Sequence, residues 1–195
     1  MKGFTINFLA LLLLGSASVY GQTKQLADGI YLKAGDFKNQ QVSEELNGSS
    51  DRLQTNSFFG GKSVKVIRNG KTNTLAKDEV FGYRLKGKDY RFYKNGAYQI
   101  ADTAGFYLYK RTELTAGRKN QVPQPVYYFS KTASSPLLKL TIGNLNSEYQ
   151  QQTDFRYALT DFFKTDAQLA NYDLRLKTYQ LKYIYAQHHK TALSK

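Results

Sequence analysis

The sequence has no cysteine and no tryptophan, and it has only two histidines and three prolines among 195 residues. Without cysteine the chain can form no disulfide, thiolate metal site, thiol nucleophile or lipidated cysteine anchor. With His188 and His189 as its only imidazoles, a multi-histidine metal site and most histidine-based catalysis are disfavoured. The sequence also lacks a phosphate-binding glycine loop, a GxSxG elbow, an HExxH motif and a calcium loop. We therefore expect no cofactor and no metal.

The first 21 residues have the features of a secretory signal peptide. Lys2 supplies a positive start, the segment from Phe4 to Leu14 is mostly apolar, and small residues lead to a cleavage site after Gly21. The alternative is a membrane anchor, but this apolar run is shorter than the ~20 residues that cross a bilayer. No later segment reaches that length. We expect an exported protein, in the periplasm or outside the cell, in which residues 22–195 form a single domain.

Positive charge and tyrosine are what the sequence has in excess. Lysine and arginine number 28 against 15 acidic residues, a formal net charge of +13, and there are 16 tyrosines. The cations are spread along the chain without a long run. Such a balance can steer a protein toward an anionic glycan or a membrane surface, or can simply keep an exported protein soluble. Nucleic acid is not expected as a partner outside the cell.

The region between residues 56 and 130 has the alternation and turn residues of antiparallel hairpins. The expected turns are Asn69-Gly70, Gly87-Lys88, Asn95-Gly96 and Asp102-Thr103-Ala104-Gly105. Two-residue loops fix the register, so Arg84 should lie opposite Arg91, and Tyr93 opposite both Gly82 and Tyr98.

That register divides the side chains between two faces. The face expected to form the core, here called the apolar face, carries Phe81, Tyr83, Leu85, Tyr90, Phe92, Phe106 and Leu108. The opposite face, here called the tyrosine–arginine face, carries Arg84, Arg91, Tyr93, Tyr98, Ile100, Tyr107 and Tyr109. The second set is neither a plain solvated face nor a plain core.

Beyond Leu140 the apolar residues recur with a helical period. We expect helices to start near Asp154, near Asp166 and near Asp173, with Leu174 inside the last one. Strands followed by helices indicate an α+β fold: an antiparallel sheet built as a meander of hairpins, with C-terminal α-helices packed on it.

The best candidate for function is the tyrosine–arginine face. The weak candidates for ligand binding are Arg84, Arg91, Tyr93 and Tyr98. Two arginines in opposition cost stability unless a carboxylate or an anionic ligand offsets them, and tyrosines beside arginine suit a nucleobase or a sugar. The alternative is that these tyrosines form a second core beneath the C-terminal helices.

Several segments resemble small uncharacterised exported proteins of Gram-negative bacteria. They are Asp28 to Leu32 with Asp36-Phe37, Val80 to Arg84 with Tyr90-Arg91, Tyr127 to Ser130, and Leu169 to Asp173. That group usually has tryptophan where Phe81 stands here. The resemblance implies an exported domain of unknown function and supplies no activity, cofactor or site.

Three functions follow as hypotheses. The first is a non-enzymatic binding module for another envelope protein or an anionic glycan. The second is a hydrolase of an envelope or imported polymer that uses unidentified carboxylates, which requires a cleft with two carboxylates and a raised pKa. The third is a structural or assembly component, which requires a large exposed apolar patch.

Overall fold

The computed structural model describes residues 26–55, 61–114 and 122–189. The expected signal peptide, residues 1–21, lies outside the described residues. Within the described residues, no helix is long and apolar enough to cross a membrane.

An eight-stranded antiparallel sheet forms the middle of the molecule, in the order β11-β10-β9-β8-β7-β6-β1-β2. Its strands are β1 (Gly29–Tyr31), β2 (Glu44–Glu45), β6 (Gly82–Leu85), β7 (Lys88–Tyr93), β8 (Gly96–Asp102), β9 (Tyr107–Glu113), β10 (Gln124–Ser130) and β11 (Leu138–Lys139). From β6 to β11 each strand pairs with the next one in sequence. The predicted meander is therefore confirmed.

Helix α1 (Ala34–Lys38) lies between β1 and β2 in the chain, and the other helices follow the large sheet. These are α2 (Ile142–Glu148), α3 (Thr153–Phe162), the 3₁₀ helix η1 (Asp166–Ala170) and α4 (Gln180–His189). A small hairpin, β12 (Tyr172–Asp173) and β13 (Thr178–Tyr179), joins η1 to α4. The α+β class predicted from the sequence is confirmed.

A second sheet was not expected. The hairpin at Asn69-Gly70 joins β4 (Ser63–Arg68) to β5 (Lys71–Ala76), and with β3 (Arg52–Gln54) these strands form a separate three-stranded sheet. It is a covering layer: Val64 and Val66 are buried against a cluster that includes Ile30 and Phe92 of the large sheet.

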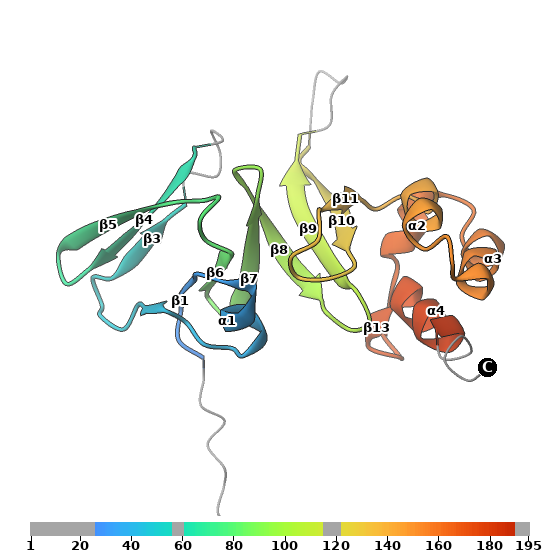
Figure 1. Cartoon of the computed structure of the whole chain (residues 1–195), viewed down its shortest axis with the longest axis horizontal. Coiled ribbons are helices and arrows are strands. Elements are labelled where there is room, and N and C mark those ends of the chain that lie inside the picture. The colour runs from blue at the N-terminus through green and yellow to red at the C-terminus, as the bar shows by residue number, and fades with distance from the viewer. Residues whose placement is uncertain (1–25, 56–60, 115–121, 190–195) are drawn as a thin grey trace, which may run out of the picture.

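The apolar face of the large sheet is covered by different layers at its two ends (Figure 1). The three-stranded sheet packs at the β1–β6–β7 end. The C-terminal helices pack at the β9–β10 end, where Phe106, Leu108 and Phe129 are fully buried together with Phe155, Leu159 and Leu181 of the helices. Each layer removes apolar surface from water, the main stabilising contribution to folding.

In two hairpins the turn lies one residue earlier in the chain than predicted. The two turns are formed by Lys86-Gly87 and Lys94-Asn95, and all four of these residues have positive φ. Gly87 takes the second turn position, where glycine is favoured. Gly96 is instead a strand residue that pairs with Tyr93, and a Cβ there would lie 2.8 Å from Nη1 of Arg111 and 2.9 Å from Cε2 of Tyr98.

The predicted opposition of Arg84 and Arg91 is therefore wrong. Arg84 lies opposite Asp89, whereas Arg91 lies opposite Gly82 on one side and Tyr98 on the other. Tyr93 lies opposite Gly96, and so opposite neither Gly82 nor Tyr98. Each cross-strand partner differs from the predicted one by two residues, and residues two apart lie on the same face, so the predicted division into two faces still holds for these strands.

Phe81 is an exception to that division. Its ring stacks on Phe37 of α1 and lies under the guanidinium of Arg91, so it belongs to the tyrosine–arginine face. The amide of Phe92 donates to the carbonyl of Phe81, so the pairing of β6 with β7 extends one residue beyond Gly82.

The helix starts also differ in detail. Gln152 and Thr165 precede α3 and η1, so Asp154 and Asp166 lie inside their first turns. The expected helix at Asp173 is wrong: Leu174 lies in the β12–β13 turn, and α4 begins at Gln180. The carboxylate of Asp173 accepts hydrogen bonds from the amides of Arg175 and Leu176, a local bonding pattern that competes with helix formation.

Candidate functional site on the tyrosine–arginine face

The C-terminal helices do not cover the tyrosine–arginine face. Its central part packs instead against Leu137, from the segment between β10 and β11, and its β1 side packs against α1. The second core predicted from the sequence therefore exists, but its position beneath the helices was wrong.

Arg91 occupies the middle of this second core and is only 6% exposed. Its guanidinium lies 5.6 to 5.8 Å from the ring centroids of Phe81, Tyr93 and Tyr109. It donates to the hydroxyl of Tyr109 at 3.2 Å, and that hydroxyl lies 3.0 Å from Oγ of Ser130. Aromatic faces and hydroxyl groups thus stabilise the buried charge.

Tyr98 is also buried, with 8% of its surface exposed. Its ring meets Tyr128 edge-on at 5.0 Å, and its hydroxyl accepts a hydrogen bond from Arg111 at 3.4 Å. Arg91 and Tyr98 are accordingly packing residues, and their role in ligand binding stays a prediction that solvent exposure does not support.

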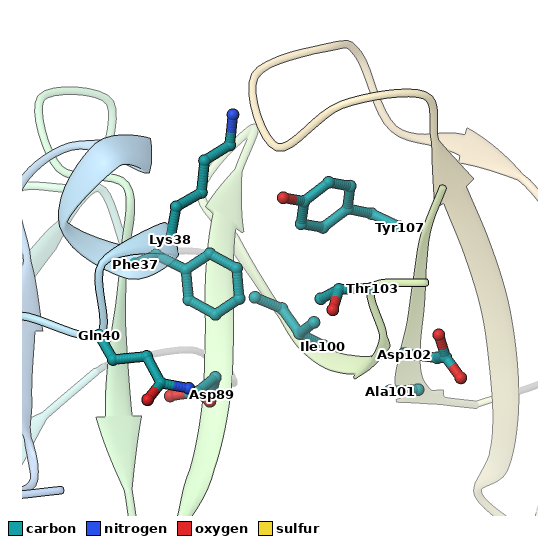
Figure 2. Close-up of a pocket in the computed structure, with 9 residues that line it drawn as sticks. All are labelled: Phe37, Lys38, Gln40, Asp89, Ile100, Ala101, Asp102, Thr103 and Tyr107. Atoms are coloured by element: carbon teal, nitrogen blue, oxygen red, sulfur yellow. The ribbon is translucent and has the colours of Figure 1, made fainter. Parts of the chain in front are cut away.

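A pocket of about 360 Å³ opens on the same face, beside that buried centre. Nine residues line it: Phe37, Lys38, Gln40, Asp89, Ile100, Ala101, Asp102, Thr103 and Tyr107. Figure 2 shows Phe37, from α1, Ile100, from β8, and Tyr107, from β9, among the side chains around the pocket. The four residues singled out in the sequence do not line it, although Arg84 contacts Asp89 in its lining.

The apolar part of the lining comes from three separate elements. Phe37 packs on Tyr31 and Phe81 and reaches Tyr107, whose ring centroid is 6.3 Å away. Ile100 lies on the adjacent strand, directly opposite the buried Tyr109. These contacts hold the aromatic rings in place without a ligand, which lowers the entropic cost of binding one.

Asp89 is fixed by two donors from neighbouring strands. Nη1 of Arg84 lies 2.9 and 2.8 Å from its two carboxylate oxygens, and the hydroxyl of Tyr31 donates to Oδ1 at 2.9 Å. Burial and the nearby carboxylate raise the pKa of Tyr31 well above its usual range, so this hydroxyl remains a donor. The charge of Asp89 is thus compensated from outside the pocket.

Asp102 is fixed from the helical side. A bulge between Ile100 and Asp102 shifts the register, and in Figure 2 the carboxylate points away from α1. Its Oδ1 lies 3.5 Å from Nζ of Lys182 in α4 and accepts from the amide of Ala104 at 2.7 Å.

Lys182 itself is 4% exposed and donates to the carbonyls of Ala104 and Phe106. Burial lowers the pKa of Lys182 to about 8, although the nearby Asp102 carboxylate opposes this shift. Through these bonds α4 holds the turn that forms one wall of the pocket.

The electrostatic balance of the pocket is positive once these pairs are counted. Asp89 and Asp102 each have a cationic partner, Arg84 and Lys182. Lys38 is exposed and forms no ion pair with any residue that the structure describes. In Figure 2 its side chain extends from α1 away from Asp89.

The lining combines two aromatic rings and an isoleucine with charged and polar side chains. The nine residues include no serine, cysteine or histidine that could act as nucleophile or base. Asp89 is ion-paired with Arg84 and Asp102 with Lys182. Across the described residues, no group of three or more potential metal ligands gathers.

Sequence reasoning identified the face but missed most of the pocket. Alternation places Ile100 and Tyr107 on it, whereas Phe37 and Lys38 come from α1, and Gln40 from the turn after α1, more than 50 residues earlier. The Asp36-Phe37 pair was noticed only as part of a resemblance. Searches of family models, curated proteins and solved structures find no match to this chain.

Proposed function

We propose that this is an exported, non-enzymatic binding protein that holds an acidic saccharide in the pocket bordered by α1 and Tyr107. The observation that carries the proposal is the composition of that pocket. It combines fixed aromatic rings and an isoleucine with polar groups, and Lys38 is its only lysine or arginine. Its volume lies near the lower end of the range for ligand pockets, which suits a short saccharide.

Sugars match this mixed lining. The C–H faces of a sugar ring pack on aromatic rings, and its hydroxyl groups need nearby donors and acceptors. Here the rings are those of Phe37 and Tyr107, and the polar groups are the Gln40 amide, the Thr103 hydroxyl and the fixed carboxylate of Asp89. Asp89 accepts from Arg84 and Tyr31 and, with about four lone-pair positions, keeps capacity for a sugar hydroxyl.

Charge favours an acidic sugar. Asp89 and Asp102 are compensated, which leaves Lys38 to meet a carboxylate or sulfate on the ligand. The net charge of +13 adds long-range attraction for such a polymer. The signal segment at residues 1–21 and the resemblance to small exported proteins both predict export. Export would bring the protein to the compartment where these glycans occur.

Calorimetric titration with short oligosaccharides tests the proposal. We expect uronic acid oligosaccharides to bind and matched neutral ones to bind more weakly. Lys38→Glu should weaken acid binding about tenfold, because it replaces an attraction by a repulsion at the pocket. Lys71→Glu, on exposed β5, changes the net charge equally and should keep the affinity.

Three results would overturn the proposal. In the first, no saccharide binds. In the second, Lys38→Glu and Lys71→Glu lose affinity equally, which means that net charge alone attracts the polymer. In the third, reducing ends are released during incubation, and Asp89→Asn or Asp102→Asn abolishes this release. That result would favour the hydrolase alternative instead.

A further inference from the structure

Exposed apolar side chains gather at the helical end of the molecule. In the described residues, nine large apolar side chains are exposed, and six of them belong to α3, the β12–β13 hairpin and α4. They are Tyr157, Phe162, Tyr172, Leu174, Leu176 and Tyr183. Apolar clusters of this kind on a monomer usually mark a contact surface.

Three of these residues line one cavity and the fourth lies at the adjacent hairpin tip; together they are here called the hairpin patch: Phe162, Leu174, Leu176 and Tyr183. Phe162, Leu176 and Tyr183 line one shallow cavity of about 220 Å³, and Leu174 lies at the adjacent hairpin tip. Leu174 is 83% exposed and Phe162 is 60% exposed. The fold therefore leaves these side chains in water, where their exposure is unfavourable.

The hairpin holds its tip away from the core. The carboxylate of Asp173 accepts the amides of Arg175 and Leu176 at 2.8 and 2.9 Å, and Lys177 has a φ of 51°. At its base, Tyr172 packs edge-on against Tyr179 at 5.1 Å. The turn is locally closed, so Leu174 does not fold back onto the helices.

We propose that the hairpin patch docks on an anionic lipid bilayer, with Leu174 and Leu176 entering the interface. The charges that border it are complementary to such a surface. Arg175 and Lys177 alternate with the two leucines, and Lys164 follows α3. All three are exposed, and none forms an ion pair with a residue that the structure describes.

The acidic groups nearby do not reverse this balance. The carboxylate of Asp173 accepts hydrogen bonds from the turn amides. The exposed Asp161 precedes Phe162 in the sequence and is the other acidic residue next to the patch. A second copy is a poorer occupant, because a two-fold contact would place the basic hairpins against each other. Leucine and aromatic side chains flanked by cations are typical of segments that lie in the membrane interface.

The absence of cysteine allows a position-specific test. Leu174→Cys and Leu114→Cys are each labelled with an environment-sensitive fluorophore in the full chain and mixed with phosphatidylcholine vesicles, with or without phosphatidylglycerol. Leu114 is 66% exposed and lies outside the helical end, so it is the matched control. We expect a blue shift at position 174 with the anionic vesicles and none at position 114.

The position of the label separates insertion of the hairpin from attachment through residues 1–21, which would not blue-shift a probe at 174. In the unlabelled chain, Leu174→Asp should remove the apolar contact, and Arg175→Ser with Lys164→Ser should weaken vesicle association about tenfold or more. Raising the salt from about 0.1 M to about 1 M should have a similar effect.

The proposal is overturned if position 174 stays in a polar environment with anionic vesicles, or if neutral vesicles give the same shift. A shift at 174 that needs no lipid but grows with protein concentration would instead identify a second copy as the occupant. This inference does not rest on the pocket, and failure of saccharide binding would leave it unchanged.

Discussion

Lys182 should give the folding stability a rising pH dependence in the mildly alkaline range. Its ammonium group is buried beneath the turn that carries Asp102, and burial lowers its pKa from 10.5 to about 8. Below about pH 8 both the folded and the unfolded chain hold this proton. Between about pH 8 and 10.5 only the unfolded chain holds it, so the free energy of unfolding increases with pH.

The size of this effect follows from the two pKa values. Where the proton difference is complete, the free energy of unfolding rises by about 1.4 kcal/mol per pH unit. Integrated from about pH 7 to about pH 9.5, Lys182 contributes an increase of about 2 kcal/mol. Lys77 is also buried and has a lowered pKa. Its contribution to the pH dependence of the unfolding free energy is the same in the original chain and in every variant that retains Lys77.

Guanidinium unfolding at a series of pH values measures this contribution. Far-ultraviolet circular dichroism is the suitable signal, because the chain has no tryptophan and tyrosine emission changes with ionisation. Lys182→Met removes the titrating group, so its unfolding free energy should lack the rise of about 2 kcal/mol. Lys65→Met, at an exposed position of β4, should retain it.

Parallel curves for the original chain and Lys182→Met would refute the reasoning. They would mean that the ammonium keeps its ordinary pKa, because water reaches it or because Asp102 compensates the cost of burial. Asp102→Asn distinguishes these cases: loss of the compensating carboxylate should lower the pKa of Lys182 further only if the two groups interact as the 3.5 Å contact implies.

Three further predictions concern packing and tyrosine ionisation. Gly82→Ala should destabilise the fold by about 2 kcal/mol or more, because its Cβ would lie 1.9 Å from the carbonyl oxygen of Tyr90. Gly35→Ala, with nothing within 4 Å, should be neutral or stabilising in the same thermal unfolding assay. Phe37→Ala should cost about 2 kcal/mol and abolish saccharide binding, since it removes the contact of α1 with Phe81 and one wall of the pocket; unchanged affinity would contradict the site. Burial raises the pKa of Tyr149 above its usual range, so stability present below pH 10 should fall at higher pH, and this fall should be smaller in Tyr149→Phe when unfolding is followed by circular dichroism.

The proposed pocket shows why the site was harder to predict than the fold. The alternation that identified Ile100 and Tyr107 as neighbours on one face depends only on the two-residue period of a strand. Phe37 and Lys38 belong to a five-residue helix with no buried residue, which has no periodic signal of its own. Only the pairing of β1 with β6 brings α1 over that face.

Periodicity and turn residues determined by themselves that this chain forms an antiparallel meander followed by helices, because these patterns are local. They also divided the strand residues between two faces. A turn misplaced by one residue changes each cross-strand partner by two residues, and residues two apart in a strand lie on the same face. The tertiary structure decided the register, in which Arg84 lies opposite Asp89 and Gly96 lies opposite Tyr93. It also decided which layer covers each face, and therefore that Arg91 is buried among aromatic rings while the neighbouring pocket stays open. These outcomes depend on contacts between residues far apart in the chain, for which a single sequence carries no local pattern.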